Sequence, residues 1–200
     1  MNNLFTKSVA ILGIAFCILT FKDLKVNNIS NIKEYLIATN DNKTFKNVNR
    51  DEILSYFDKD NAVIYIGSTN EEHEVLLEML SELASDYKID NLVSFDSTKE
   101  SPILSLKTET SYKVDREPTS FYNEILDKVG VFARDYDVIN NNNEAIQTDY
   151  KIIIDPTVFF VKNGKIIFSY FLEDIKLTDK ELDDIKNIYK EGFEKLSINI

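Results

Sequence analysis

The sequence predicts an α/β domain with a parallel βαβ core, because short apolar runs alternate with helical patterns along most of the chain. Residues 62–66 (AVIYI) form a continuous apolar run that ends at Gly67, which suits a strand buried on both faces. Residues 92–95 are the next predicted buried strand, and a long helical pattern separates the two. Asn163-Gly164 lies between two β-prone runs and is the strongest hairpin signal in the chain.

The predicted elements of the amino-terminal half follow in order. A short β-prone run at 35–39 comes first, and Asn49-x-x-Glu52 is a capping box that opens a helix over 50–57. The long helix after Gly67 presents an apolar stripe made of Leu76, Leu80, Leu83 and Tyr87. A strand is predicted at 112–114, and Thr119 opens the next helix. One face of that helix is expected to carry Ile125, Val129, Phe132 and Tyr136.

The carboxyl-terminal part is rich in predicted strands. An asparagine loop at 140–143 precedes strands at 150–154, 157–162 and 165–171. The last helix opens with Thr178-x-x-Glu181. Its apolar face consists of Leu182, Ile185, Tyr189, Phe193 and Leu196.

Composition excludes several classes of protein. The 200 residues include 34 acidic and 23 basic side chains, a net charge of -11, which argues against a nucleic-acid partner because phosphate binding needs a surplus of Lys and Arg. The single cysteine excludes an intrachain disulfide and a cysteine-based zinc site.

Residues 1–21 are predicted to be a signal sequence or membrane anchor rather than part of the fold. An uncharged apolar run over 8–21 lies between Lys7 and Lys22. A helix of about 14 residues is roughly 21 Å long and the hydrocarbon core is about 30 Å thick, so the run spans only if both lysines extend toward the membrane surfaces. No small-x-small cleavage site follows Phe21, which favours an uncleaved anchor.

Two alternatives to this anchor stay open. A cleaved signal would make the protein secreted, and Cys17 would be lipidated if the run were a lipoprotein signal, although Phe16 is too bulky for the position beside the cleaved bond. We expect a single-pass protein of the cell membrane whose globular domain lies outside the cytoplasm. Residues 22–43 are then a tether with the first short strand, and residues 44–200 are the domain.

Two segments resemble the thioredoxin-like family. Residues 154–171 (IDPTVFFVKNGKIIFSYF) show its Pro-Thr at the start of a strand, its Lys-Asn-Gly-Lys hairpin and its next strand. Residues 61–83 (NAVIYIGSTNEEHEVLLEMLSEL) resemble its other half, with a buried strand, a short loop and a long helix. The IYIG phrase is similar to the branch described as bacteriocin-transport accessory proteins. The resemblance implies a thioredoxin-like three-layer sandwich with a mixed central sheet, an insertion around 97–149 and a cis Pro156.

The sequence departs from this family where the redox chemistry takes place. The relatives carry Cys-x-x-Cys at the start of the long helix, where the helix amino terminus lowers a thiol pKa. The matching positions here are Glu71, Glu72, His73 and Glu74. The family's acidic residue in the preceding strand and its tryptophan are also missing. Because no cysteine lies in the globular part, no thiol–disulfide oxidoreductase activity is expected.

The same resemblance suggests a peptide-binding groove. In the family, the residue before the cis-proline exposes backbone groups that pair with an extended peptide, and here that residue is Asp155. The groove is expected to consist of Glu71, Glu72, His73, Glu74, Asp155, Pro156 and Thr157. Its carboxylates would favour a basic or uncharged peptide.

The first turn of the long helix also invites a metal interpretation, since His73 and its neighbouring carboxylates are metal-ligand types. His73 is the only histidine, and adjacent helical residues point in different directions. The carboxylates are explained more simply by the helix dipole, which favours negative charge there. We therefore expect no metal and no cofactor.

The function that these observations predict is binding, not catalysis. We expect a membrane-tethered, redox-inactive accessory module that binds an extended peptide or protein partner, with a role in peptide export. The alternative is an enzyme or metal-binding protein that uses the acidic positions 71–74 at the same groove.

Overall fold

The structure is a computed structural model that describes residues 45–68, 71–172 and 179–198. The predicted anchor at 8–21, the tether at 22–43 and the strand at 35–39 lie outside these residues. Among the described residues, no helix is both long enough and apolar enough to cross a membrane.

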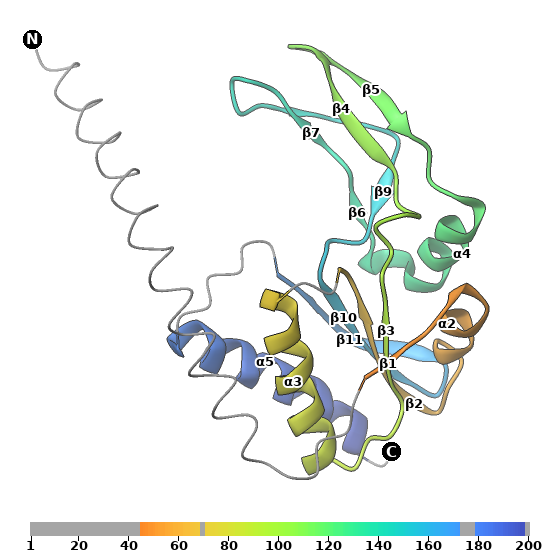
Figure 1. The fold of residues 1–200 in the computed structure, drawn as a ribbon, viewed down its shortest axis with the longest axis vertical. Coiled ribbons are helices and arrows are strands. Elements are labelled where there is room, and N and C mark those ends of the chain that lie inside the picture. Colours follow the sequence, from red (N-terminus) through yellow and green to blue (C-terminus); the bar gives the residue numbers. More distant parts are fainter. Residues whose placement is uncertain (1–44, 69–70, 173–178, 199–200) are drawn as a thin grey trace, which may run out of the picture.

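A five-stranded mixed sheet forms the centre of the fold (Figure 1). Its strands are β1 (Lys46–Asn47), β2 (Asn61–Ile66), β3 (Leu92–Phe95), β10 (Thr157–Lys162) and β11 (Lys165–Phe171), in the order β1-β3-β2-β10-β11. The first three run parallel to one another, whereas β10 is antiparallel to both β2 and β11. The predicted α/β class, parallel core and mixed sheet are therefore confirmed.

Helices cover both faces of this sheet because its central strands are apolar on both sides. Helices α3 (Glu71–Asp86) and α5 (Asp179–Ser197) pack on one face, where Val63, Tyr65 and Phe160 point. Helices α2 (Arg50–Tyr56) and α4 (Ser120–Val129) pack on the other, where Ile64, Phe159 and Val161 point. Two apolar cores thus lie on opposite sides of one sheet.

Helix α5 approaches the sheet closely at Gly192. A Cβ atom at this position would lie 2.6 Å from the ring of Phe160, which is too close for real atoms. The next residue, Phe193, packs edge-on against the same ring with centroids 5.2 Å apart. The missing side chain of Gly192 therefore lets α5 lie directly on β10.

Several local signals in the sequence are confirmed. Asn49 and Glu52 form the predicted capping box of α2, and the hydroxyl of Thr119 accepts a hydrogen bond from the backbone N–H of Tyr122 to cap α4. Asn163 and Gly164 have φ values of 50° and 69° in the β10–β11 turn, as a two-residue hairpin requires. The apolar face of α5 is buried as predicted.

The insertion between β3 and β10 contains both core and protruding parts. Its strands are β4 (Ile103–Thr108), β5 (Ser111–Arg116), β6 (Arg134–Asp135), β7 (Val138–Ile139), β8 (Ala145–Ile146) and β9 (Lys151–Ile152), which pair as β4–β5, β6–β9 and β7–β8. Helix α4 belongs to the core, whereas the β4–β5 and β7–β8 hairpins project away from the sheet (Figure 1). We call these two hairpins the arm.

Two predicted elements differ from the structure. The helix opened by Thr119 was expected to carry Phe132 and Tyr136 on its apolar face, but it ends at Val129 because Gly130 adopts a φ of 53°. Phe132 lies instead in the 3-10 helix η1 (Gly130–Phe132), and Tyr136 follows β6. The strand predicted at 150–154 is reduced to β9, and residues 153–156 between β9 and β10 are not in a strand.

Candidate functional site

The sheet brings three separate segments together at one end of β2. Ile66 is the last residue of β2 and pairs with Phe95, the last residue of β3, on one side. On the other side it pairs with Thr157, the first residue of β10. The residues that follow β2 and β3 therefore meet the Asp155-Pro156 loop that precedes β10.

Ser68 is fixed from several directions at this junction. Its backbone N–H donates to the Asp155 carboxylate, 2.9 Å from Oδ1 and 3.1 Å from Oδ2. Its carbonyl oxygen accepts from the Tyr65 hydroxyl at 3.0 Å and from His73 Nδ1 at 2.6 Å. The turn after β2 is thus tied to its own strand, to α3 and to the loop before β10.

His73 is buried, with 6% of its surface exposed, and its ring is used inside the fold. Nδ1 carries a proton, because the Ser68 carbonyl that it contacts can only accept. The Ser68 hydroxyl lies 3.2 Å from this same nitrogen and the Asp155 carboxylate 3.8 Å from it. The hydroxyl and the carboxylate thus lie near the same ring nitrogen, whereas a nucleophilic triad places them on opposite ring nitrogens.

The loop before β10 packs tightly on the turn after β2. The Asp155-Pro156 peptide bond is cis, as the family resemblance implied. A Cβ atom on Gly67 would lie 2.4 Å from Asp155 Oδ1 and 3.0 Å from Pro156 Cα. Only glycine therefore permits this approach at position 67.

Asp155 is the exposed residue of this loop. Within the described part of the chain, its backbone N–H and C=O have no hydrogen-bond partner. The next carbonyl, of Pro156, accepts from the Leu172 N–H, and the buried Thr157 donates its hydroxyl to the Ile154 carbonyl. Within the described residues, backbone pairing thus begins at Pro156 and Thr157 and does not include Asp155.

The predicted residues 71–74 are divided by the structure. His73 points inward and Glu74 is exposed, as expected for neighbours on a helix. The side chains of Glu71 and Glu72 lie outside the described part of the structure. Across the residues that the structure does describe, no three His, Cys, Asp or Glu side chains are grouped so as to hold a metal ion. The metal or enzyme alternative stays a prediction.

The site is acidic. Burial raises the pKa of Tyr65 well above its ordinary value, and the nearby carboxylates of Asp155 and Asp96 raise it further. Both aspartates are exposed, and among the described residues neither forms an ion pair with a lysine or arginine. Sequence analysis missed Asp96 and the close contact of Gly67, although parallel strands that end at one edge imply that the residues after β2 and β3 are neighbours.

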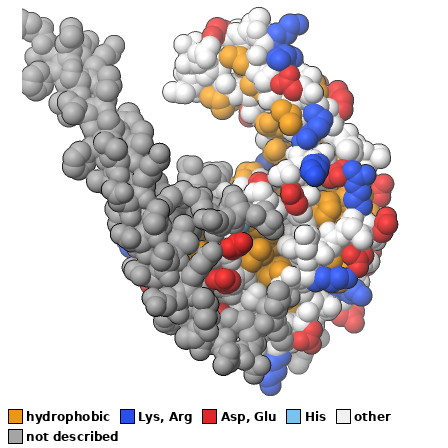
Figure 2. Space-filling view, in the orientation of Figure 1, with side chains coloured by type: hydrophobic (Ala, Val, Ile, Leu, Met, Phe, Trp, Pro, Cys, Tyr) orange, Lys and Arg blue, Asp and Glu red, His pale blue; other side chains and the backbone are white. Residues whose placement is uncertain are grey.

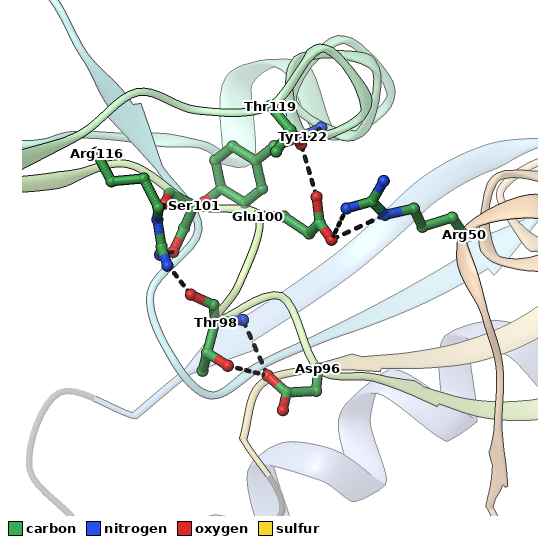
Figure 3. Close-up of polar contacts among 8 residues, drawn as sticks. All are labelled: Arg50, Asp96, Thr98, Glu100, Ser101, Arg116, Thr119 and Tyr122. Carbon is green, nitrogen blue, oxygen red and sulfur yellow. Dashed lines mark hydrogen bonds and ion pairs between the residues drawn. The ribbon is translucent and has the colours of Figure 1, made fainter.

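A polar network fixes the segment that leaves β3 for the arm (Figure 3). Glu100 is only 5% exposed and accepts hydrogen bonds from Arg50 Nε at 2.8 Å and from the Thr119 hydroxyl at 2.7 Å. Burial acts to raise the pKa of Glu100, but the hydrogen bonds from Thr119 and Arg50 outweigh it, so this pKa lies below its ordinary value.

The same segment connects Asp96 to the arm. The Asp96 carboxylate accepts from the Thr98 N–H at 2.9 Å and from its hydroxyl at 2.6 Å. Arg116, on β5, donates to the Thr98 carbonyl and, at 2.9 Å, to the Ser101 carbonyl (Figure 3). A chain of hydrogen bonds thus runs from the site to the base of the β4–β5 hairpin.

The segment that connects β9 to β10 is fixed by Tyr122 of α4. Its hydroxyl, in a fully buried side chain, accepts a hydrogen bond from the Ile153 N–H at 2.9 Å. Burial raises the pKa of Tyr122 to about 12. This contact holds the chain two residues before Asp155.

We expect Tyr122→Phe to lower the free energy of unfolding by about 1–3 kcal/mol, because the buried Ile153 N–H loses its acceptor. Urea denaturation measures this change. Tyr136→Phe is the control, since no hydrogen bond involves that hydroxyl among the described residues. Equal stabilities of the two variants would contradict the role given to Tyr122.

We expect Glu100→Gln to lower the free energy of unfolding by about 1–3 kcal/mol at neutral pH and to flatten its dependence on acid. The folded-state pKa lies below the ordinary value of 4.5, so this stabilisation is complete above pH 4.5 and is lost as the pH falls through the folded-state pKa.

Urea denaturation at a series of pH values between about 3 and 7 measures the effect of Glu100→Gln. Glu124→Gln, at an exposed position of α4, is the matched control. If wild type and Glu100→Gln lose stability equally on acidification, Glu100 does not contribute as described.

Comparisons with known proteins identify no relative of this chain, so a functional proposal depends on the geometry of the site around Asp155. No family model matches the chain, and neither the curated proteins nor the solved structures include a match.

Proposed function

We propose that this protein is a thioredoxin-like domain without redox activity that binds an extended polypeptide segment and is held at the membrane by residues 8–21. The strand order β1-β3-β2-β10-β11, the cis-proline before β10 and the helices on both faces support the thioredoxin-like assignment. A role as an accessory protein in peptide export agrees with this assignment and with the apolar amino-terminal run.

One observation carries the binding proposal. Asp155 is an exposed residue beside a sheet strand, and its backbone N–H and C=O are unpaired within the described residues. An extended peptide that lies along this loop would supply the missing donor and acceptor, as in strand addition to a sheet edge. The rigid contacts of Gly67 and Ser68 hold this backbone in place before the peptide arrives, which lowers the entropic cost of binding.

The charge of the site indicates which peptide binds. Asp155 and Asp96 are exposed carboxylates without a lysine or arginine partner among the described residues. The whole chain carries a net charge of -11, which would attract a basic segment and repel an acidic one. The same charge disfavours nucleic acid.

We expect the full-length protein in detergent micelles to bind the six-residue peptide (Lys-Val-Ser)2 in preference to (Glu-Val-Ser)2. Gly67→Ala should weaken binding at least about tenfold, because the added Cβ displaces Asp155 and Pro156. Fluorescence anisotropy of the labelled peptides measures both results.

Gly164→Ala is the control for Gly67→Ala. It strains a positive φ at the far end of β10, yet its Cβ would meet no atom closer than 3.8 Å. Asp155→Asn should remove much of the preference for lysine while keeping the acceptor for Ser68, and Asp60→Asn, at the opposite end of β2, controls for net charge. Equal binding of both peptides, or none, contradicts the proposal.

We also expect no reduction of insulin disulfides by this protein. The reason is chemical: Cys17 is the only cysteine and lies in the apolar amino-terminal run. A turbidity assay with dithiothreitol as electron donor, and with a dithiol thioredoxin as positive control, measures this. Catalysed precipitation of insulin would show that the redox assignment is wrong.

A further inference from the structure

Asn163-Gly164, the turn between β10 and β11, is the only Asn-Gly pair in the chain. Both residues are exposed, and among the described residues the Asn163 side-chain amide has no hydrogen-bond partner. Asparagine deamidates most readily before glycine, because no side chain hinders approach to the glycine nitrogen. Acidic and basic side chains are interspersed over the described surface that Figure 2 shows, so this reactive pair, rather than a charged patch, distinguishes a further site.

The deamidation reaction uses only the chain and water. The Gly164 backbone nitrogen loses its proton and attacks Cγ of the Asn163 side chain. A new C–N bond forms there, and the bond to the side-chain nitrogen breaks, so ammonia leaves. Water then opens the resulting cyclic succinimide at either carbonyl, which gives aspartate or isoaspartate. Overall, water is taken up and ammonia is released.

The folded protein restrains both reacting groups through the loop over residues 57–60, between α2 and β2. The Gly164 N–H donates to the Lys59 carbonyl at 3.0 Å, and the Asn163 N–H donates to the Asp60 carbonyl at 2.9 Å. The first bond holds the proton that must leave the attacking nitrogen. Ring closure also requires the Asn163 backbone to rotate out of the turn, in which its φ is 50°. The reaction therefore requires the turn to separate from this loop.

The loop is itself anchored to the domain. Phe57 is buried, and its ring packs against that of Phe159 with centroids 6.1 Å apart. The Asp58 carboxylate accepts from Lys128 Nζ of α4 at 2.7 and 2.9 Å. Gly164 lies against the same segment, since a Cβ on it would be 3.8 Å from Asp58 Cα. The core and α4 thus hold the loop in the position from which it restrains the turn.

Isoaspartate would change this end of the sheet, because its main chain runs through the former side chain and contains an extra carbon. The two hydrogen bonds to the 57–60 loop then lose their present spacing. The neighbouring Lys162 donates from Nζ to the Lys195 and Leu196 carbonyls at the end of α5, at 3.3 and 3.0 Å. The reaction therefore alters a turn that lies beside contacts between β10 and that helix.

We propose that Asn163 is a deamidation site that the fold keeps slow, and that it reacts only in molecules whose β10–β11 turn has separated from the 57–60 loop. The rate is then the intrinsic rate of an open Asn-Gly pair multiplied by the population of the open form. Each tenfold reduction below the intrinsic rate corresponds to about 1.4 kcal/mol of opening free energy. This inference is independent of peptide binding, because Asp155 lies at the other end of β10.

The test follows the full-length protein in detergent micelles at mildly alkaline pH, with and without concentrated urea. Chymotrypsin releases the peptide 161–168, in which mass spectrometry measures conversion of Asn163 and enzymatic methylation identifies isoaspartate. We expect conversion in the folded protein to be at least about tenfold slower than in urea. The asparagines at 140–143 are the internal control, because none precedes glycine and all should convert far more slowly in urea.

Lys128→Gln tests the role of the 57–60 loop. It removes the ion pair with Asp58, so conversion in the folded protein should accelerate about two- to fivefold, the effect of an exposed ion pair. Lys186→Gln is the matched control, because it removes an ion pair with Glu82 on the opposite face of the sheet and should leave the rate unchanged. In urea, wild type and both variants should convert at the same rate.

Equal conversion rates in the folded and urea-treated wild type would overturn the inference, because the fold would then give no protection. A folded Lys128→Gln protein that converts no faster than Lys186→Gln would also overturn it, since the 57–60 loop would not control the reaction. If Asn163 is not converted even in urea, this pair is not a deamidation site.

Discussion

The close approach between Gly67 and the Asp155-Pro156 loop is the constraint on which the candidate site depends. It is possible only because position 67 has no side chain, and it brings the Asp155 carboxylate to the Ser68 N–H at 2.9 Å. This hydrogen bond joins the end of the central parallel strand to the start of an antiparallel one. The loop contains Asp155, whose backbone has no hydrogen-bond partner among the described residues, and without this support holding one geometry would carry a large entropic cost.

The rest of the fold serves to hold that junction. Strands β2 and β10 are buried on both faces, so their positions are set by two independent apolar cores. Buried polar contacts then fix the two segments that connect the sheet to the insertion. Glu100 fixes the segment that follows β3, and Tyr122 fixes the segment between β9 and β10. Polar groups buried in this way are costly unless they are paired, and here the pairing specifies the path of the chain.

The local features and the sheet class were predictable from the sequence, whereas the individual long-range side-chain contacts were not. The capping box at Asn49 and the hairpin turn at Asn163 depend on neighbouring residues alone, so the local sequence pattern was sufficient to predict them. Asp155 and Pro156 were identified through a family resemblance, not through spacing. The contact between Arg50 and Glu100 joins residues 50 positions apart, and no local pattern indicates it. Gly130 indicates a helix end, but apolar residues continue at helical spacing beyond it, so the predicted helix face extended to Tyr136, whereas α4 ends at Val129.

The hydrogen bond between Arg116 and Ser101 affects how this domain can change over evolutionary time. Arg116 Nε donates to the Ser101 carbonyl at 2.9 Å, so the two ends of the β4–β5 hairpin are in contact. A loop with joined ends can be lengthened, shortened or exchanged by recombination without moving the scaffold that carries it. The length of the β4–β5 hairpin can therefore change more readily than that of α4, which fills a core.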